Sequence, residues 1–246
     1  MSGMLAVVCF PGSNCEHDVA AAWESVGGTA AIVWHTATSL GDADAVVLPG
    51  GFAHGDYLRP GAIARFSPVM DAVARFAAGG GPVVGICNGF QVLTEAGLLP
   101  GALYRNSGLR FLCKTVECEV ASTDSVLTGG ARAGQVLRLP INHYEGNYTC
   151  DERTLLELES EERVVLRYRG ENPNGSVHAI AGITNRERNV VGVMPHPERA
   201  SDPLLGSADG RLLLESLLVA SATVRRWAGG NGTGPESVHA SGPAAS

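Results

Sequence analysis

The sequence predicts an α/β protein built on a mostly parallel β-sheet with an antiparallel extension. Over the first hundred residues, short apolar runs alternate with segments of helical periodicity. Short buried strands that alternate with helices are typical of a parallel sheet covered by helices on both faces. After Pro100 and Gly101, strand patterns follow one another with little helix between them, which predicts antiparallel strands added to the parallel part.

The predicted strands are apolar runs bounded by glycine, proline and polar residues. Four of them belong to the parallel part, at residues 5–10, 30–34, 45–48 and 82–86. Five more follow in the second half, at residues 110–121, 135–139, 163–168, 179–184 and 189–194. No internal repeat divides the chain, so the second group of strands is interpreted as an extension of the first sheet and not as a second domain.

Helical spacing predicts the first two helices. Val19, Trp23 and Val26 recur at helical spacing, and a capping box over 13–16 is expected to start this first helix. The second helix is expected to open at Pro60, with a break at Pro68, because proline is tolerated only in the first turn of a helix. Its expected apolar side consists of Ile63, Phe66, Val73 and Phe76.

Two further helices are expected, and the chain end differs from the rest in composition. One helix covers 88–96 and is stopped by Gly97, and a closing helix over 212–227 is expected to pack back onto the core. Residues 229–246 hold Gly, Ser, Ala and Pro with few large apolar side chains. We therefore expect one domain over 1–228 and a disordered tail over 229–246.

Composition and charge exclude several classes of protein. With 246 residues, of which 45% are hydrophobic, the chain can bury a sizeable core. Its net charge of −7 argues against nucleic acid or an anionic membrane as main partner, because both favour a basic surface. The apolar residues 1–10 carry no positive charge and are too short for a membrane span, so we expect a cytoplasmic protein. The six cysteines include no CxxC pair, which predicts reduced thiols, mostly in the core, and no metal site.

Cys87 lies in a segment typical of a nucleophile. Gly85-Ile86-Cys87-Asn88-Gly89 joins an apolar strand to a helix, as in a nucleophile elbow with cysteine in place of serine. The turn raises the thiol above the carboxyl ends of the strands, and the helix N-terminus favours the thiolate. The Asn88 amide is then placed to donate to a developing oxyanion. The same pattern also fits a buried structural cysteine at a tight turn.

A candidate base and its orienting carboxylate occur in Met194-Pro195-His196-Pro197-Glu198-Arg199. The prolines favour an extended backbone, in which residues i and i+2 point the same way. Glu198 is therefore expected to hold the His196 imidazole in one tautomer, as a triad carboxylate does. A histidine beside a glutamate is also common as a surface pair. An α/β-hydrolase is disfavoured, because its acid precedes its histidine.

With the strand that ends in Pro49-Gly50-Gly51, these segments resemble the class I, triad-type glutamine amidotransferases. Further segments are similar to the glutaminase subunits of phosphoribosylformylglycinamidine synthases, which serve purine synthesis; these segments are 10–15, 55–59, 99–103, 145–148 and 172–176. The resemblance extends from about Leu5 to Trp227. It implies the three-layer, flavodoxin-like fold of these amidotransferases.

The resemblance also implies roles for individual residues. Cys87 is the nucleophile, His196 the general base and acid, and Glu198 the orienting carboxylate. The remaining implied residues are Gly51 and Asn88, whose backbone amides form the oxyanion hole, and Gln91, His143 and Tyr144, which bind glutamine. The sequence departs from the family pattern at three positions: Asn142 and Tyr144 replace smaller residues, and His54 stands where tyrosine is frequent.

The implied substrate is L-glutamine, and the implied partners are the large synthetase subunit of the complex together with its small third subunit. The chain has no P-loop or other nucleotide cradle, so no cofactor is expected on it, and ATP and Mg²⁺ are expected on the synthetase subunit. A glutaminase serving another synthetase, of guanylate or cobalamin synthesis, remains the nearest alternative. A silent binding module of the same fold, or a related cysteine hydrolase, isomerase or chaperone, is disfavoured by the intact Cys, His and Glu.

Overall fold

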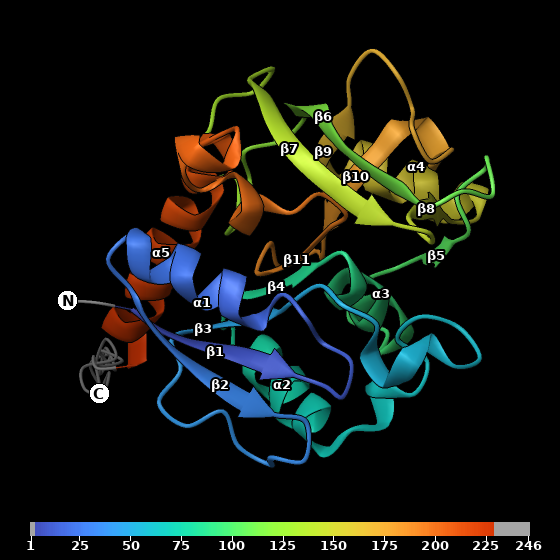
Figure 1. Ribbon diagram of the computed structural model, residues 1–246. Coiled ribbons are helices and arrows are strands. Elements are labelled where there is room, and N and C mark those ends of the chain that lie inside the picture. Colours follow the sequence, from blue (N-terminus) through green and yellow to red (C-terminus); the bar gives the residue numbers. More distant parts are fainter. Residues whose placement is uncertain (1–2, 229–246) are drawn as a thin grey trace, which may run out of the picture.

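The protein folds around one nine-stranded sheet, accompanied by a small two-stranded sheet (Figure 1). The computed structural model describes residues 3–228. The large sheet has the order β2-β1-β3-β4-β11-β10-β9-β6-β7. Its strands are β1 (Met4–Cys9), β2 (Thr29–Trp34), β3 (Ala45–Leu48), β4 (Val83–Ile86), β6 (Leu112–Val120), β7 (Val136–His143), β9 (Val164–Tyr168), β10 (Ile180–Thr184) and β11 (Val190–Val193). The small sheet pairs β5 (Ala102–Tyr104) with β8 (Asn147–Thr149).

The large sheet combines a parallel half with an antiparallel half, as the sequence predicts. β2, β1, β3, β4 and β11 run parallel, whereas β10, β9, β6 and β7 join in antiparallel pairs. Every residue of β3, β4 and β11 is buried, because helices cover both faces there. β11 comes late in the chain but pairs with β4, so the two halves of the sequence form a single sheet.

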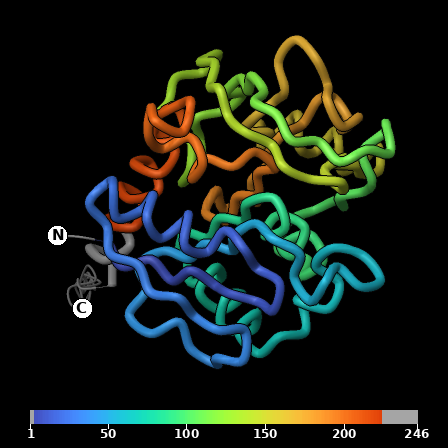
Figure 2. Tube along the Cα trace, viewed as in Figure 1, coloured from blue at the N-terminus to red at the C-terminus, as the bar shows by residue number. Residues whose placement is uncertain are grey.

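The parallel half has the expected three layers, with helices on both faces of the sheet. The α-helices of the described residues are α1 (Glu16–Ser25), α2 (Pro68–Ala78), α3 (Asn88–Glu95), α4 (Glu152–Ser160) and α5 (Asp209–Ala228). α1 and α5 contact each other on one face, and α2 and α3 lie on the other (Figure 1). α5 returns to the side of the molecule where β1 begins (Figure 2). In the described part of the chain, no helix is long and apolar enough to span a membrane.

Close packing fixes α3 on the sheet. The Phe90 ring is fully buried, and a Cβ added to Gly192 of β11 would lie 2.0 Å from it. On its other side Phe90 stacks on Tyr148 of β8, with ring centroids 5.8 Å apart. Gly89 faces β3, where an added Cβ would lie 1.9 Å from the Leu48 carbonyl oxygen. The start of α3 is therefore held rigidly between the two sheets.

Two helix predictions for the first hundred residues are wrong. α2 begins at Pro68 and not at Pro60, because proline at the first helical position has a suitable φ and needs no amide partner. Phe66 lies before this helix and is 76% exposed, so it is not part of an apolar side. The expected capping box is also absent, since the Ser13 hydroxyl accepts from the Phe10 amide and Cys15 caps α1 without a side-chain bond.

The second half of the chain contains elements that the sequence patterns did not reveal. α4 lies between the predicted strands, where little helix was expected, and it begins with Asp151 accepting from the Thr154 amide at 2.7 Å. β7 continues four residues past its predicted end at Leu139, and the short strands β5 and β8 were not predicted. The predicted tail over 229–246 lies outside the described residues, and the domain boundary at 228 stays a prediction.

We expect the packing of Gly89 on β3 to be required for stability. Gly89→Ala forces a Cβ against the Leu48 carbonyl, which should lower the free energy of unfolding by about 2 kcal/mol or more. Urea denaturation followed by circular dichroism measures this loss as a lower midpoint. Gly108→Ala is the matched control, because nothing lies within 4 Å of the added Cβ. Equal midpoints for the two variants would contradict the close approach of α3 and β3.

Candidate active site

Cys87 occupies the predicted elbow between β4 and α3. Its φ of 51° and ψ of −105° are strained for a residue with a side chain, and only surrounding structure can maintain them. An added Cβ on Gly85 would lie 2.6 Å from the Gly89 carbonyl, so the turn needs glycine there. The Cys87 side chain is buried, and its Sγ lies 3.7 Å from the Asn142 carbonyl, to which the thiol donates.

The sheet brings His196 to this elbow across 109 residues of sequence. β4 and β11 are parallel neighbours in which Val193 pairs with Ile86, so Cys87 and His196 follow adjacent strand ends. The Cys87 amide donates to the Val193 carbonyl at 2.7 Å. The His196 amide donates to Pro140 of β7 at 2.8 Å, which fixes the backbone of the base from the antiparallel half.

His196 and Glu198 form a buried pair. His196 Nδ1 lies 2.6 Å from Glu198 Oε1, and the two side chains are 2% and 0% exposed. The prediction that they meet is confirmed, but the predicted extended backbone is wrong. Pro197–Ala200 forms a 3-10 turn with proline at its first position, and the turn brings the carboxylate back to the imidazole. Because the Ser201 hydroxyl donates to the Glu198 carbonyl at 3.0 Å, the turn is held in place.

The surroundings of His196 favour its protonated form. Burial opposes the charge, but the Glu198 carboxylate and the thiols of Cys87 and Cys15 outweigh it, and the pKa of His196 is raised well above its usual value. Since Nδ1 donates to Glu198, Nε2 is the nitrogen left for proton exchange with a thiol. Within residues 3–228, Nε2 is buried and has no hydrogen-bond partner.

The two predicted oxyanion donors lie at adjacent strand ends. The Gly50 carbonyl accepts from the amides of Asn14 and Cys15 at 3.3 and 3.2 Å. In a trans peptide the next N–H points the opposite way, so this bond turns the Gly51 amide away from α1. No backbone hydrogen bond between described residues uses the Gly51 N–H. Asn88 is the first residue of α3, whose early amides have no intrahelical partner. Their assignment to an oxyanion hole stays a prediction.

The side chains of Asn88 and Gln91 link the elbow to two loops. Asn88 Oδ1 accepts from the Ala53 amide at 3.0 Å, and its Nδ2 donates to Asp56 at 3.1 Å and to Gln91 Oε1 at 2.8 Å. Gln91 Nε2 in turn donates to the Glu145 carbonyl. Burial raises the pKa of Asp56 to about 6, although its bond with Asn88 acts in the opposite direction. Gln91 therefore lies beside the elbow with both ends of its amide bonded.

The other two predicted glutamine-binding residues are both linked to Asn106, and His143 lies near the base. His143 is buried, its Nδ1 lies 3.1 Å from Asn106 Oδ1, and burial together with nearby His196 lowers its pKa to about 4. It is therefore neutral at neutral pH. Tyr144 is half-buried, and its carbonyl accepts from the Asn106 amide at 2.9 Å. Contacts of Gln91, His143 and Tyr144 with glutamine stay predictions.

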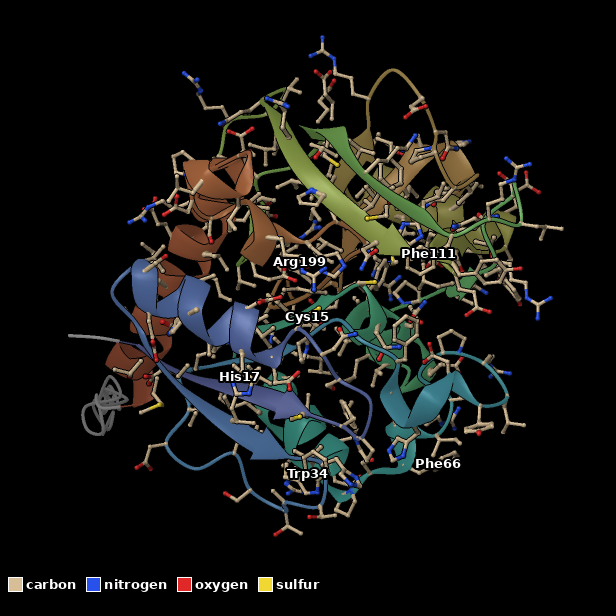
Figure 3. The ribbon with its side chains drawn as sticks, in the orientation of Figure 1. Cys15, His17, Trp34, Phe66, Phe111 and Arg199 are labelled. Atoms are coloured by element: carbon tan, nitrogen blue, oxygen red, sulfur yellow. The ribbon has the colours of Figure 1, made fainter. Side chains whose placement is uncertain are left out.

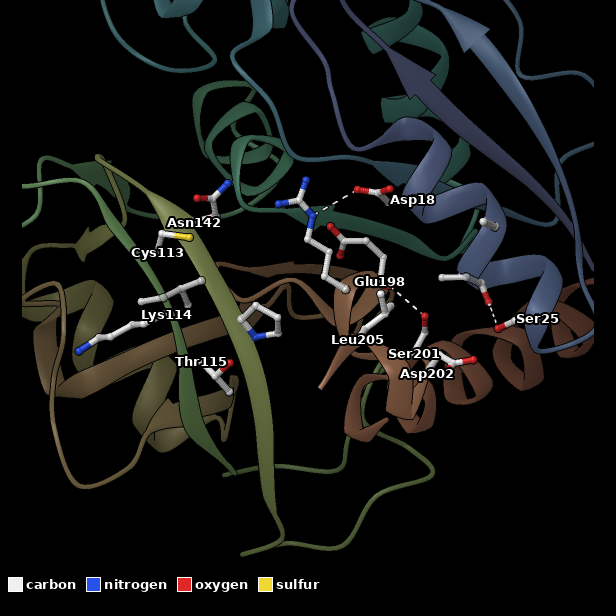
Figure 4. Close-up of a pocket in the computed structure, with 15 residues that line it drawn as sticks. Asp18, Ser25, Cys113, Lys114, Thr115, Asn142, Glu198, Ser201, Asp202 and Leu205 are labelled. Atoms are coloured by element: carbon white, nitrogen blue, oxygen red, sulfur yellow. Dashed lines mark hydrogen bonds and ion pairs between the residues drawn. The ribbon is translucent and has the colours of Figure 1, made fainter. Parts of the chain in front are cut away.

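A cleft of about 740 Å³ lies beside the site and is lined by Glu198, but not by Cys87 or His196. It lies between α1, the turn after His196 and the β6–β7 pair, and Figure 4 shows Asp18 and Ser25 on α1 facing Glu198 and Ser201 across it. Arg199 Nε donates to Asp18 at 3.2 Å, and its Nη2 lies 3.2 Å from the Cys15 sulfur. Figure 3 shows Cys15, just before α1, close to Arg199, which lies on the turn after His196.

Cys15, Asp56, Asn106 and Arg199 belong to the site but were not predicted. Cys15, Asp56 and Arg199 lie inside the segments 10–15, 55–59 and 194–199, so a signal was present. The Cys15 sulfur, one nitrogen of His196 and one oxygen of Glu198 lie within 4.8 Å of one another. Such groups can bind metal ions, but the Arg199 guanidinium at the sulfur disfavours a cation, and we assign none.

Comparison with known proteins gives a consistent result. Residues 4–211 match the family model described as CobB/CobQ-like glutamine amidotransferase domain. The chain is 57% identical to phosphoribosylformylglycinamidine synthase subunit PurQ of Rubrobacter xylanophilus, over 87% of this chain and 97% of that one. It is 54% identical to the subunit of the same name from Koribacter versatilis, over 88% and 97% of the two chains.

Solved structures agree with these relatives. A chain in the structure of PurLQS from Thermotoga maritima superposes with a TM-score of 0.82 at 41% identity, covering 89% of this chain and 99% of that one. A chain described as a putative GMP synthase protein from Thermoplasma acidophilum gives a TM-score of 0.66 at 15% identity, over 93% and 98% of the two chains. The second likeness shows a shared fold only.

We expect Glu198→Gln to lower the pKa of His196. The Glu198 carboxylate raises that pKa, and the amide has nearly the same shape without the charge, so the imidazole should lose its proton at lower pH than in the wild type. NMR titration of ¹⁵N-labelled histidine measures the shift. Glu215→Gln removes an exposed charge from α5 and serves as control. An unchanged His196 titration would show that Glu198 does not support the imidazolium.

Proposed function

Because the chain belongs to the PurQ family of phosphoribosylformylglycinamidine synthase subunits, which contain a CobB/CobQ-like glutamine amidotransferase domain, we propose that it is the glutaminase subunit of such a synthase. In this role it hydrolyses glutamine to glutamate and ammonia and delivers the ammonia to a synthetase subunit for purine synthesis. The proposal rests above all on the buried His196–Glu198 pair beside the strained Cys87 elbow. A structural cysteine requires neither feature.

The first half of the proposed reaction forms a thioester. The Cys87 thiol passes its proton to His196 Nε2, and the sulfur attacks the side-chain carbonyl carbon of glutamine. The amides of Gly51 and Asn88 stabilise the resulting oxyanion. The imidazolium then gives its proton to the departing nitrogen, the C–N bond breaks, and ammonia leaves. Glu198 stays ionised and holds Nδ1 throughout.

The second half hydrolyses the thioester with the same residues. His196 accepts a proton from water, and the hydroxide attacks the thioester carbonyl under the same oxyanion donors. The C–S bond breaks as the sulfur regains the proton from the imidazolium, and glutamate is released. The burial of His196 and Glu198 strengthens the interactions on which both halves depend.

The chain supplies ammonia, so the ligation takes place elsewhere. We propose that ATP and Mg²⁺ bind to the large synthetase subunit, that a small third subunit completes the complex, and that the complex functions in the cytoplasm. Relatives are named as synthase subunits, and one structural neighbour comes from PurLQS. Tyr57 and Leu58 are 74% and 93% exposed, beside Asp56 and the elbow network, and are suited to apolar contact with a partner.

Cys87→Ala tests the division of labour. We expect loss of glutamine-dependent synthesis by the assembled complex, because the nucleophile is removed, while synthesis from ammonium salts continues on the partner. Cys113→Ala removes an exposed thiol from β6 and should leave both activities unchanged. If Cys87→Ala abolished the ammonia-dependent activity of a complex that still assembles, the proposed division would be wrong.

We also expect the isolated chain to be a poor glutaminase. The loop with Asp56 bonds to Asn88 at the elbow, and its Tyr57 and Leu58 are exposed. Glutamate release, measured with and without the synthetase and third subunits, should rise on assembly. High activity of the chain alone would contradict this dependence.

A further inference from the structure

A second cysteine lies directly against the catalytic base. Cys15 precedes α1, is 2% exposed, and places its sulfur within 4.8 Å of a nitrogen of His196 and an oxygen of Glu198. Gly50 leaves the space that both groups share, because a Cβ there would lie 2.7 Å from His196 Cε1 and 3.1 Å from the Cys15 sulfur. The thiol and the imidazole therefore lie side by side over Gly50.

The orientation of this thiol is fixed by two hydrogen bonds. It donates to Asn14 Oδ1 at 3.2 Å, and it accepts from Arg199 Nη2 at 3.2 Å. Arg199 also donates to Asp18 of α1, so its guanidinium bonds two acceptors, the Cys15 sulfur and the Asp18 carboxylate. The backbone N–H of Cys15 donates to the Gly50 carbonyl, the bond that directs the Gly51 amide. Cys15 thus contacts both the base and the predicted oxyanion loop.

Arg199 has a competing acceptor close by. Glu198 Oε2 is buried and has no hydrogen-bond partner among residues 3–228, and Arg199 is the next residue in the chain. Although burial opposes it, the Cys15 sulfur and the carboxylates of Glu198 and Asp18 raise the pKa of Arg199, so all three attract its charge. A guanidinium that moved to Oε2 would form an ion pair with Glu198. This ion pair would weaken the attraction between the Glu198 carboxylate and the His196 imidazolium.

We propose that Cys15 is a positioning residue of the thioester-forming site: its sulfur packs the His196 imidazole in place and holds the Arg199 guanidinium away from Glu198. This role rests on the proposed function, since it acts on the same base. The reaction still uses Cys87 as its only nucleophile, and Cys15 forms no bond with substrate. Loss of the Cys15 sulfur should destabilise the protonated form of His196, whereas Cys87, His196 and Glu198 should all remain in the site.

The sign of the pH effect follows from the groups around His196. Glu198 lies on its own turn, Cys87 on the elbow, Cys15 before α1 and neutral His143 on β7. Glu198 and the two thiols raise the pKa of His196, while burial lowers it. Removing the sulfur, and letting Arg199 approach Glu198, both lower that pKa. The basic limb of the rate profile, which reports loss of the proton given to ammonia, must therefore move to lower pH.

The experiment measures glutamine-dependent synthesis by the assembled complex from low to high pH, with ammonia-dependent synthesis as internal reference. For Cys15→Ala we expect kcat to fall roughly tenfold or more, because small displacements of a catalytic group are costly. The KM for glutamine should change little, and the basic limb should move to lower pH. Cys15→Ser keeps a donor and an acceptor at this position and should recover most of the kcat.

Two further variants make the outcome decisive. Cys9→Ala removes another buried thiol, which donates to the Phe10 carbonyl, and should leave the profile unchanged. Arg199→Lys keeps the charge but replaces the two nitrogens that bond Asp18 and Cys15 with a single one, and should shift the basic limb in the same direction as Cys15→Ala. Unshifted limbs in both Cys15→Ala and Arg199→Lys, or the same loss in Cys9→Ala, would overturn the role of Cys15. A wild-type complex without glutamine-dependent activity would instead contradict the proposed function.

Discussion

The parallel pairing of β4 with β11 is the constraint on which the active site depends. It aligns Val193 with Ile86, and the bond from the Cys87 amide to the Val193 carbonyl ties the elbow to the strand that leads to His196. A shift of one residue in this register would turn every side chain of β11 to the opposite face and would break the alignment of nucleophile and base. Buried valines on both strands make such a shift costly, because the core sets the register.

Glycines after β3 and at the start of α3 allow the catalytic groups and the elements that carry them to approach one another. Gly50 leaves room for the His196 imidazole and the Cys15 sulfur, and Gly89 lets α3 touch the backbone of β3. The strained φ of Cys87 is maintained because α3 is fixed on both sides by this packing. The close packing of α3 therefore maintains the strained backbone that holds the reactive thiol in place.

The charges of the site form a layered network around the imidazole. Glu198 binds it directly, Cys15 and Cys87 flank it, and Arg199 with Asp18 form an outer pair that reaches α1. A second network, from Asp56 through Asn88 to Gln91, connects the elbow to the exposed loop that carries Tyr57 and Leu58. The first network supports the base, and the second links the proposed oxyanion donors to the surface where we expect a partner.

Local sequence determined the elements whose signals are short-range. The Gly-rich elbow at Cys87, the buried strands before it, and the combination of His196 with Glu198 can be read from neighbouring residues, because glycine, proline and apolar runs act over a few positions. The tertiary structure alone decided that His196 follows a strand next to β4. It also decided that Cys15 and Arg199, 184 residues apart, meet beside the base. Such contacts arise from sheet order and burial, which depend on the whole chain, and no local pattern contains them.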